Sequence, residues 1–326
     1  MPSLSMPALY AADLVKTYRA GRKKPVVRAV DGLSMEVAGG SVFGLLGPNG
    51  AGKSTTVRIL ATLCRADSGT ASVCGVDVSS DADRVRHLIG LVSQKPASDP
   101  MGTGRENLVL AGLLHGLPRR AAATRADELL GRFGLDDSAD RLAKTYSGGM
   151  SRKLDVAIGL MHRPAVLFLD EPTTGLDPEA RADLWAQIRG LAKGDGATVL
   201  LTTHYLDEAD QLADRLAIVD HGRVVVEGAP DELKRELHGD TIQAELAPGT
   251  DVARAAAVLV EQAGLHDVAA AGRNLRARAD DGARRVPVIL TALESAGFEV
   301  VSVTTARPCL DDVYLRHLGR SFEVAA

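Results

Sequence analysis

The chain of 326 residues is 45% hydrophobic and 25% charged, and it exceeds the roughly 250–300 residues beyond which chains split into domains, so we expect two domains. Its formal net charge of −4 gives no general attraction for polyanions, which argues against a protein that binds nucleic acid over its whole surface. No apolar run approaches the roughly 18 residues of a membrane span, and the three cysteines fit neither a disulfide framework nor a zinc site, so we expect a cytoplasmic protein without zinc.

The first segments predict strands. Residues 9–18 and the alternating apolar residues Leu33, Met35 and Val37 are typical of half-buried strands, separated by a basic loop at residues 19–24. From Ser41 onward, short apolar runs end in turns and precede helical segments, the pattern of parallel strands joined by crossover helices. The fold class is therefore predicted to be α/β, with strands at residues 42–46, 88–93, 166–169, 198–202 and 216–220.

Two further regions depart from that alternation. Residues 105–161 are rich in helical patterns broken at Gly116, Pro118 and Gly134, which predicts a helical subdomain inside a first domain spanning residues 7–238. Residues 241–305 follow the order strand, helix, strand, strand, helix, strand, and a last helix is expected at 310–318. The sequence therefore predicts a small α+β ferredoxin-like domain at residues 239–320.

One segment has the sequence of a phosphate-binding loop. It fits the pattern G-x-x-x-x-G-K-S between an apolar strand and an amphipathic helix, and reads Gly47-Pro48-Asn49-Gly50-Ala51-Gly52-Lys53-Ser54. Its glycines let successive N–H groups converge on phosphate oxygens at a helix N-terminus. Lys53 is expected to reach the β- and γ-phosphates, Ser54 to bind Mg²⁺ and Thr55 to contact the phosphates. A plain glycine-rich turn would leave the Lys-Ser pair unexplained, so we predict that the chain binds ATP and Mg²⁺.

An acidic pair follows the strand at residues 166–169. Asp170 and Glu171 are costly to place side by side unless a cation and a water molecule lie beside them. Mg²⁺ suits Asp170, and Glu171 is placed to orient or deprotonate the attacking water. The structural alternative is a solvated acidic pair at a strand end.

A second glycine-containing segment precedes a helix, and it reads Tyr146-Ser147-Gly148-Gly149-Met150. The chain then shows, in order, a phosphate loop, a glutamine after a strand, an S-G-G signature, an acidic strand and a histidine after the next strand. Over residues 9–238 this order resembles the nucleotide-binding subunits of ABC transporters. The resemblance implies an ABC-type P-loop ATPase domain in which ATP hydrolysis drives transport.

The resemblance also implies a shared site. Ser147, Gly148 and Gly149 are expected to contact the γ-phosphate held on the phosphate loop of a second chain, so a homodimer is expected. Gln94 is expected to sense Mg²⁺ as a metal ligand and to couple to the membrane subunit. His204 is expected to hydrogen-bond the γ-phosphate.

Two more residues match the family pattern. Asp177 resembles the acidic residue of the D-loop, although its structural alternative is to cap the helix that begins at Pro178. Tyr18 resembles the aromatic residue that stacks on adenine. The signature departs from the family at Tyr146 and Met150, where Leu and Gln are usual, and Met150 cannot supply an amide hydrogen bond.

Two segments narrow the resemblance to the daunorubicin/doxorubicin-resistance branch of ABC exporters: Thr103-Gly104-Arg105-Glu106-Asn107 and Leu310-Asp311-Asp312-Val313-Tyr314-Leu315. This branch implies a separate transmembrane permease subunit, efflux of a drug-like or antibiotic-like small molecule, and a peripheral location on the inner face of the cell membrane. Its C-terminal domain is expected to support assembly or regulation.

Two alternatives remain at this point. A soluble ABC-type ATPase could use the same dimer on nucleic acid or ribosomes, but the chain has a single phosphate loop and an acidic balance, so no nucleic acid is expected. An adaptor that binds ATP without hydrolysing it is disfavoured because Lys53, Asp170, Glu171 and His204 are all present. The transported compound and the identity of the permease are left open.

Overall fold

The computed structural model describes residues 6–19, 26–237, 239–263 and 265–319. The basic loop predicted at residues 19–24 lies, after Arg19, outside the described residues. The chain divides into two compact units, and the division falls between Pro230 and Asp231, earlier than the predicted boundary at residue 238. The reason is that helix α8 (Pro230–Arg235) leads into buried Leu237, whose carbonyl oxygen accepts a hydrogen bond from Arg278 of the second unit.

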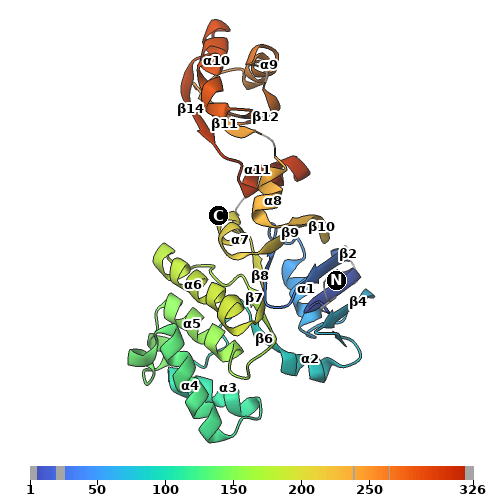
Figure 1. Cartoon of the computed structure of the whole chain (residues 1–326), viewed down its shortest axis with the longest axis vertical. Coiled ribbons are helices and arrows are strands. Elements are labelled where there is room, and N and C mark those ends of the chain that lie inside the picture. Colours follow the sequence, from blue (N-terminus) through green and yellow to red (C-terminus); the bar gives the residue numbers. More distant parts are fainter. Residues whose placement is uncertain (1–5, 20–25, 238, 264, 320–326) are drawn as a thin grey trace, which may run out of the picture. The chain divides into compact units, whose positions relative to one another are not determined.

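The first unit begins with an antiparallel sheet (Figure 1). Its strands are β1 (Leu9–Arg19), β2 (Val26–Val37), β4 (Ser68–Val73) and β5 (Val76–Asp77), in the order β2-β1-β4-β5. The alternation of Leu33, Met35 and Val37 confirms the sequence pattern, since all three side chains are buried.

A second, six-stranded sheet lies at the centre of this unit in the order β10-β9-β3-β8-β7-β6. Its strands are β3 (Val42–Leu46), β6 (Ile89–Val92), β7 (Val166–Asp170), β8 (Thr198–Thr203), β9 (Arg215–Asp220) and β10 (Arg223–Gly228). β3 pairs in parallel with β8 and β9, and β7 with β6 and β8, whereas β10 is antiparallel to β9. All five predicted strands are present within one residue at each end.

The two faces of the central sheet pack into different cores. Phe43, Leu45 and Phe168 point to one face, where they pack with helix α1 (Lys53–Leu60) and the antiparallel sheet. Leu167 and Leu169 point to the other face, where they pack with α5 (Gly148–Gly159) and α6 (Pro178–Asp195). The helix after the phosphate loop and the helix after the S-G-G segment therefore cover opposite faces of one sheet.

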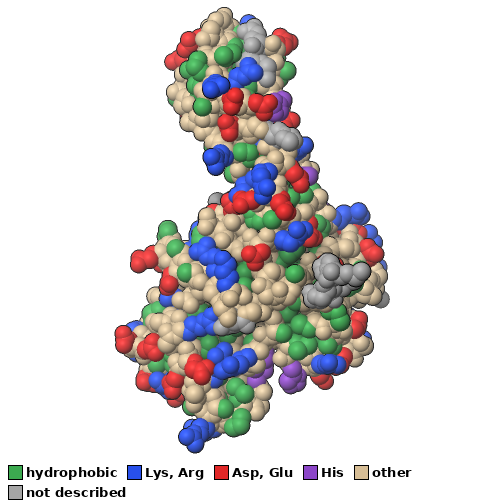
Figure 2. Space-filling view, viewed as in Figure 1, with side chains coloured by type: hydrophobic (Ala, Val, Ile, Leu, Met, Phe, Trp, Pro, Cys, Tyr) green, Lys and Arg blue, Asp and Glu red, His purple; other side chains and the backbone are tan. Residues whose placement is uncertain are grey.

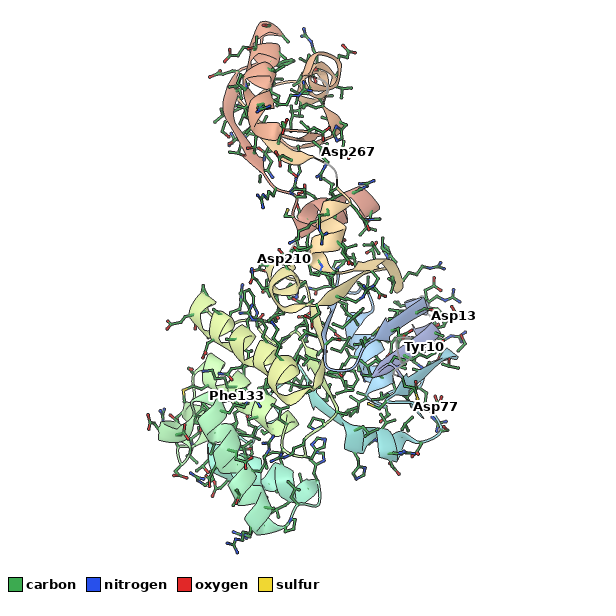
Figure 3. The ribbon with its side chains drawn as sticks, in the orientation of Figure 1. Tyr10, Asp13, Asp77, Phe133, Asp210 and Asp267 are labelled. Carbon is green, nitrogen blue, oxygen red and sulfur yellow. The ribbon has the colours of Figure 1, made fainter. Side chains whose placement is uncertain are left out.

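The predicted helical subdomain is confirmed. It contains α3 (Gly104–Leu114), α4 (Arg119–Phe133), two 3-10 turns (Asp136–Ser138 and Ala143–Thr145) and α5. Thr103 and Glu106 form a capping box at the start of α3, and α4 ends at Gly134 with φ 64°. Phe133 on α4, labelled in Figure 3, is buried in the core beneath these helices. The remaining helices of this unit are α2 (Ala82–Leu88) and α7 (Leu206–Leu212).

The second unit has a ferredoxin-like arrangement, as predicted. Its four-stranded antiparallel sheet runs β12-β13-β11-β14, with β11 central and β14 at an edge. The elements in chain order are α8, β11 (Asp240–Leu246), α9 (Val252–Ala263), β12 (His266–Ala271), β13 (Asn274–Ala279), α10 (Gly282–Ser295), β14 (Val300–Ala306) and α11 (Leu310–Leu318). Over the described part of the chain, no helix is long and apolar enough to cross a membrane.

The terminal motif at residues 310–315 has a structural role within this unit. Asp312 is buried, and its Oδ2 accepts hydrogen bonds from Thr241 Oγ1 at 2.9 Å and from the Cys309 amide at 2.9 Å. Arg276 Nε lies 2.9 Å from Asp312 Oδ1. This network joins α11 to β11 and β13, so the acidic residues of the motif fasten the last helix to the sheet.

Candidate active site

The phosphate loop takes a shape that only glycine allows at two positions. A Cβ on Gly47 would lie 2.2 Å from Val219 O, and one on Gly52 would lie 2.3 Å from Ala29 O. Gly52 also has φ 106°, a conformation that other residues rarely adopt. The loop leads directly into α1, whose first turn has no side-chain cap. The amides at this helix start are therefore left to bind an anion such as the phosphates of ATP.

Lys53 is buried at the base of this loop. Its Nζ donates hydrogen bonds to Gly47 O at 2.7 Å and to Pro48 O at 3.1 Å, and it lies 3.8 Å from Glu171 Oε1. Burial lowers the pKa of Lys53, and the charges of Glu171 and Asp170 oppose this shift. The fold thus keeps Lys53 Nζ at the base of the loop and close to Glu171 of the acidic pair.

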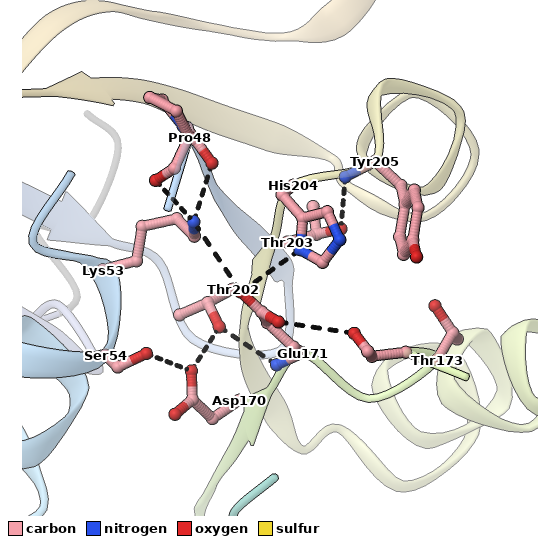
Figure 4. A network of polar contacts seen from close by, with 12 residues as sticks. Pro48, Lys53, Ser54, Asp170, Glu171, Thr173, Thr202, Thr203, His204 and Tyr205 are labelled. Atoms are coloured by element: carbon pink, nitrogen blue, oxygen red, sulfur yellow. Dashed lines mark hydrogen bonds and ion pairs between the residues drawn. The ribbon is translucent and has the colours of Figure 1, made fainter. Parts of the chain in front are cut away.

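Asp170 and Ser54 come together from elements far apart in the sequence (Figure 4). Ser54 Oγ donates to Asp170 Oδ1 at 2.9 Å, and Thr202 Oγ1 donates to the same oxygen at 2.6 Å. Two hydroxyls and a carboxylate form the all-oxygen set that Mg²⁺ prefers, so these residues fit a magnesium ion that also binds phosphate. The sequence predicted Ser54 and Asp170 but not Thr202.

Glu171 adopts an unusual backbone conformation at the end of β7. Its φ is 49°, which costs a non-glycine residue about 1–3 kcal/mol. Its amide donates to Thr202 O and to Thr202 Oγ1, both at 3.1 Å, which offsets this strain. The twist brings Oε1 to within 3.2 Å of His204 Nδ1 and 3.8 Å of Lys53 Nζ. The side chain is 9% exposed, so the carboxylate lies in a nearly enclosed site between two basic groups.

His204 follows β8 on the opposite side of Glu171. The residue is 9% exposed, and its ring packs against the Tyr205 ring with 4.2 Å between centroids. Nδ1 is buried and lacks a hydrogen-bond partner among the described residues, because its 3.2 Å approach to Glu171 Oε1 does not have hydrogen-bond geometry. A buried nitrogen of this kind is available to a ligand, which fits the predicted contact with the γ-phosphate.

The signature segment starts α5. Ser147 is the N-cap, and its Oγ accepts a hydrogen bond from the Met150 amide at 3.2 Å. Gly148 and Gly149 form the first turn, and a Cβ on Gly149 would lie 2.9 Å from Ala180 Cβ. Ser147 and Gly148 are exposed, so the helix start presents a hydroxyl and backbone amides at the surface. α5 and α1 cover opposite faces of the central sheet, so the signature helix and the helix after the phosphate loop pack into different cores.

Tyr146, which departs from the family signature, has a packing role. Its hydroxyl donates to Ser138 O at 2.7 Å, and the side chain is buried. A Cβ on Gly104 would lie 2.2 Å from this hydroxyl, so Gly104 leaves the room that Tyr146 needs. Met150 packs against the same core. Both departures thus have packing roles within the helical subdomain, where Tyr146 binds the turn at Ser138 and Met150 adds to the core.

Three other predicted residues, Tyr18, Asp177 and Gln94, have contacts that do not by themselves assign their predicted roles. Tyr18 is 36% exposed on β1, with its hydroxyl 3.8 Å from Cys64 Sγ. Burial raises the pKa of Tyr18, whereas a hydrogen bond with Thr55 lowers it, so the ring lies near the start of α1. Asp177 caps α6, accepting from the Ala180 amide at 2.8 Å, which is its structural alternative. Gln94 is exposed in the loop after β6, two residues past the strand end.

Reasoning from the sequence missed three residues beside the site. Arg152 and Asp155 on α5 bind the loop that carries Gln94, and Thr202 binds both Asp170 and Glu171. The only sequence signal for Arg152 and Asp155 was their opposite charge at a spacing of three residues, shortly after the signature. Thr202 gave no signal, because a threonine in an apolar strand usually packs there for its shape.

Comparison with known proteins agrees with this geometry. A family model described as ABC transporter matches residues 30–174. A daunorubicin resistance ATP-binding protein of Streptomyces coeruleorubidus is 50% identical over 92% of this chain and 93% of its own length. The chain belongs to the ABC transporter ATP-binding proteins. This ABC ATPase is also 47% identical to the daunorubicin/doxorubicin resistance ATP-binding protein of Streptomyces peucetius, over 98% of this chain and 96% of that one.

A solved structure carries the same fold. It is a dimeric ATP-binding cassette in a post-hydrolysis state with ADP and Pi bound. Its sequence is 25% identical, and the match covers 68% of this chain and 98% of that chain with a TM-score of 0.62. The ABC ATPase therefore binds and hydrolyses ATP in support of transport.

The comparisons support the transporter and not the nucleic-acid alternative. On the face shown in Figure 2, basic and acidic side chains are interspersed, without one broad basic surface.

Proposed function

We propose that this ABC ATPase is the motor subunit of an exporter of drug-like small molecules. It works as a homodimer with Mg²⁺ and ATP, on the inner face of the cell membrane, bound to a separate transmembrane permease. The observation that supports this most directly is the placement of Glu171 between Lys53 and His204, beside Asp170 and the phosphate loop. The drug-like substrate is inferred from the names of the two resistance proteins that it resembles over nearly their whole length.

Each residue then has a chemical role in hydrolysis. The amides of the phosphate loop and Lys53 bind the phosphates and offset the negative charge that develops on them. Ser54 and Asp170 hold Mg²⁺, which neutralises further phosphate charge when bound. Glu171 orients the attacking water in line with the γ-phosphate and accepts its proton at Oε1. His204 Nδ1 contacts the γ-phosphate and fixes the enclosed arrangement.

The homodimer follows from the division of the site. The signature and the phosphate loop lie at the starts of helices that cover opposite faces of one sheet, and the similar solved cassette is dimeric; both observations support a site that a second chain completes. Two copies related by a twofold axis place each signature over the phosphate loop of the other, an isologous arrangement. ATP then lies between the two chains and contributes to their association.

A mixed-dimer experiment tests the shared site. In a Glu171→Gln background, Lys53→Ala damages the phosphate loop and Ser147→Arg damages the exposed signature, so each variant alone is expected to bind no ATP between chains. Mixing the two leaves one site per dimer with an intact Lys53 from one chain and an intact Ser147 from the other. We expect ATP-dependent dimers with about one retained ATP each, measured by sedimentation and nucleotide analysis. If each chain completed its own site, mixing could not restore retention.

A transport experiment tests the exporter assignment. The ATPase is purified with the integral membrane protein that accompanies it from detergent-solubilised membranes, and both are placed in vesicles with the ATPase outside. Adding ATP is expected to drive an anthracycline into the vesicles, and the complex with Glu171→Gln is expected to drive none. Uptake that is equal with and without ATP, in a complex that hydrolyses ATP, would show that the substrate class is wrong.

A further inference from the structure

Arg152 makes an unusual set of contacts in the second turn of the signature helix. It is 8% exposed, and its guanidinium donates to four backbone oxygens. Nε donates to Pro172 O at 2.8 Å, Nη1 to Ser93 O at 2.6 Å, and Nη2 to Asp170 O at 3.1 Å and Glu171 O at 3.3 Å. A planar guanidinium with five fixed donors is suited to such convergent oxygens, and lysine is not.

These contacts restrain the backbone of the catalytic glutamate from one side. The left-handed conformation of Glu171 turns the chain so that three successive carbonyls, from residues 170 to 172, reach one guanidinium. On the other side, the Glu171 amide bonds to Thr202. The strained conformation, and with it the direction of the Glu171 carboxylate, therefore depends on Arg152 as well as on the central sheet.

The same helix holds the loop that carries Gln94. Arg152 binds Ser93 O just before Gln94, and Asp155 Oδ1 accepts from the amides of Ala97 at 2.9 Å and Ser98 at 3.2 Å. Burial raises the pKa of Asp155, and these amides together with the charge of Arg152 lower it. Both ends of the glutamine loop are thus fastened to consecutive turns of α5.

We propose that Arg152 is a positioning residue through which the signature helix sets the Glu171 backbone and the glutamine loop of its own chain. This rests on the proposed function, in which Ser147 to Gly149 engage ATP held by the partner. Arg152 follows Ser147 by five residues on one rigid helix, so any shift of α5 on engagement moves the guanidinium. The carbonyls bonded to it move as well, and each chain's catalytic glutamate responds to the nucleotide of the other site.

The variant Arg152→Met tests this role, because it keeps an unbranched buried side chain and removes all five donors. We expect kcat per folded molecule to fall at least about tenfold while the ATP affinity of the phosphate loop stays within about twofold. In a Glu171→Gln background, ATP is still expected to form dimers, since Ser147 and the glycines are intact. Amide hydrogens of residues 93–99 and 170–174 are expected to exchange faster. Arg152→Lys should recover part of kcat, because an ammonium has three donors.

The adjacent variant Lys153→Met is the matched control, since Lys153 lies on the same helix but pairs with Asp183 on α6. It should leave kcat and both exchange rates unchanged. Wild-type protein without ATPase activity would contradict the proposed function itself. If the wild type is active and Arg152→Met is equally active, the inference is overturned and the proposed function stands. A loss of kcat in Arg152→Met without faster amide exchange in residues 93–99 or 170–174 would also overturn the inference. If Arg152→Met fails to fold, wild-type kcat in Arg152→Lys overturns it.

Discussion

Replacing Glu171 with glutamine is expected to lower ATP turnover by about 10²- to 10⁴-fold, the contribution typical of a general base. The amide keeps the size of the carboxylate and can still accept the hydrogen bond from Thr174 Oγ1. It cannot take a proton from water, and it removes the negative charge beside Lys53 and His204. ATP binding is therefore retained, and the dimer that forms around ATP persists. Phosphate release and sedimentation velocity, each with and without ATP, measure the two effects.

The matched control is Glu179→Gln, the same change at an exposed position in the first turn of α6. Its turnover should equal that of the wild type, and its dimers should dissociate as ATP is hydrolysed. Turnover above about one tenth of the wild-type rate in Glu171→Gln would contradict the assignment of Glu171 as the base. Loss of ATP binding in that variant would instead mean that the carboxylate holds the phosphate loop together.

Replacing Lys53 with alanine is expected to weaken ATP binding at least about 30-fold, since removing one partner of a buried, hydrogen-bonded charge pair costs about 2–5 kcal/mol. The ammonium is the charged donor nearest to the phosphate-binding amides of the loop. Isothermal titration with ATP gives the affinity.

The fold should survive this change. Burial disfavours the charged form of Lys53 and lowers its pKa, so removing this side chain relieves a desolvation cost. The same change leaves Gly47 O and Pro48 O without their hydrogen-bond donor. The circular dichroism spectrum should match that of the wild type. Lys193→Ala, at an exposed position on α6, should change neither affinity nor spectrum. Unchanged ATP affinity in Lys53→Ala would refute the phosphate-loop assignment.

Much of the fold was predictable because its signals are local. Apolar runs such as residues 42–46 and 166–169 have to be buried on both faces, which leaves central parallel strands as the simplest solution. The order of elements in residues 241–305 specified the ferredoxin-like arrangement. The predicted boundary at residue 238 differs from the division between Pro230 and Asp231, because the sequence shows that α8 is a helix but not to which compact unit it belongs.

Much of the candidate site was also predictable, because its motifs are local in the sequence. Strands β3, β7 and β8 are parallel neighbours, so their carboxyl ends share one edge of the sheet. Motif spacing and strand order therefore bring together the site residues at or after these ends, which are Lys53, Ser54, Asp170 and His204. Gln94 follows β6 at that edge as well, yet it is exposed. The backbone of its loop binds the side chains of Arg152 and Asp155 on α5, and motif spacing does not specify these contacts.

The sequence by itself determined the ATP-binding chemistry, because a glycine loop ending in Lys-Ser and a strand ending in Asp-Glu each need only their own neighbours to define a role. The tertiary structure alone decided how these groups are aimed. The left-handed turn at Glu171 is held by contacts from other elements, because Thr202 accepts from its amide and the guanidinium of Arg152 donates to its carbonyl oxygen. Such contacts join residues about twenty to sixty positions apart through carbonyls and amides that every residue type possesses, so no pattern of side chains records them.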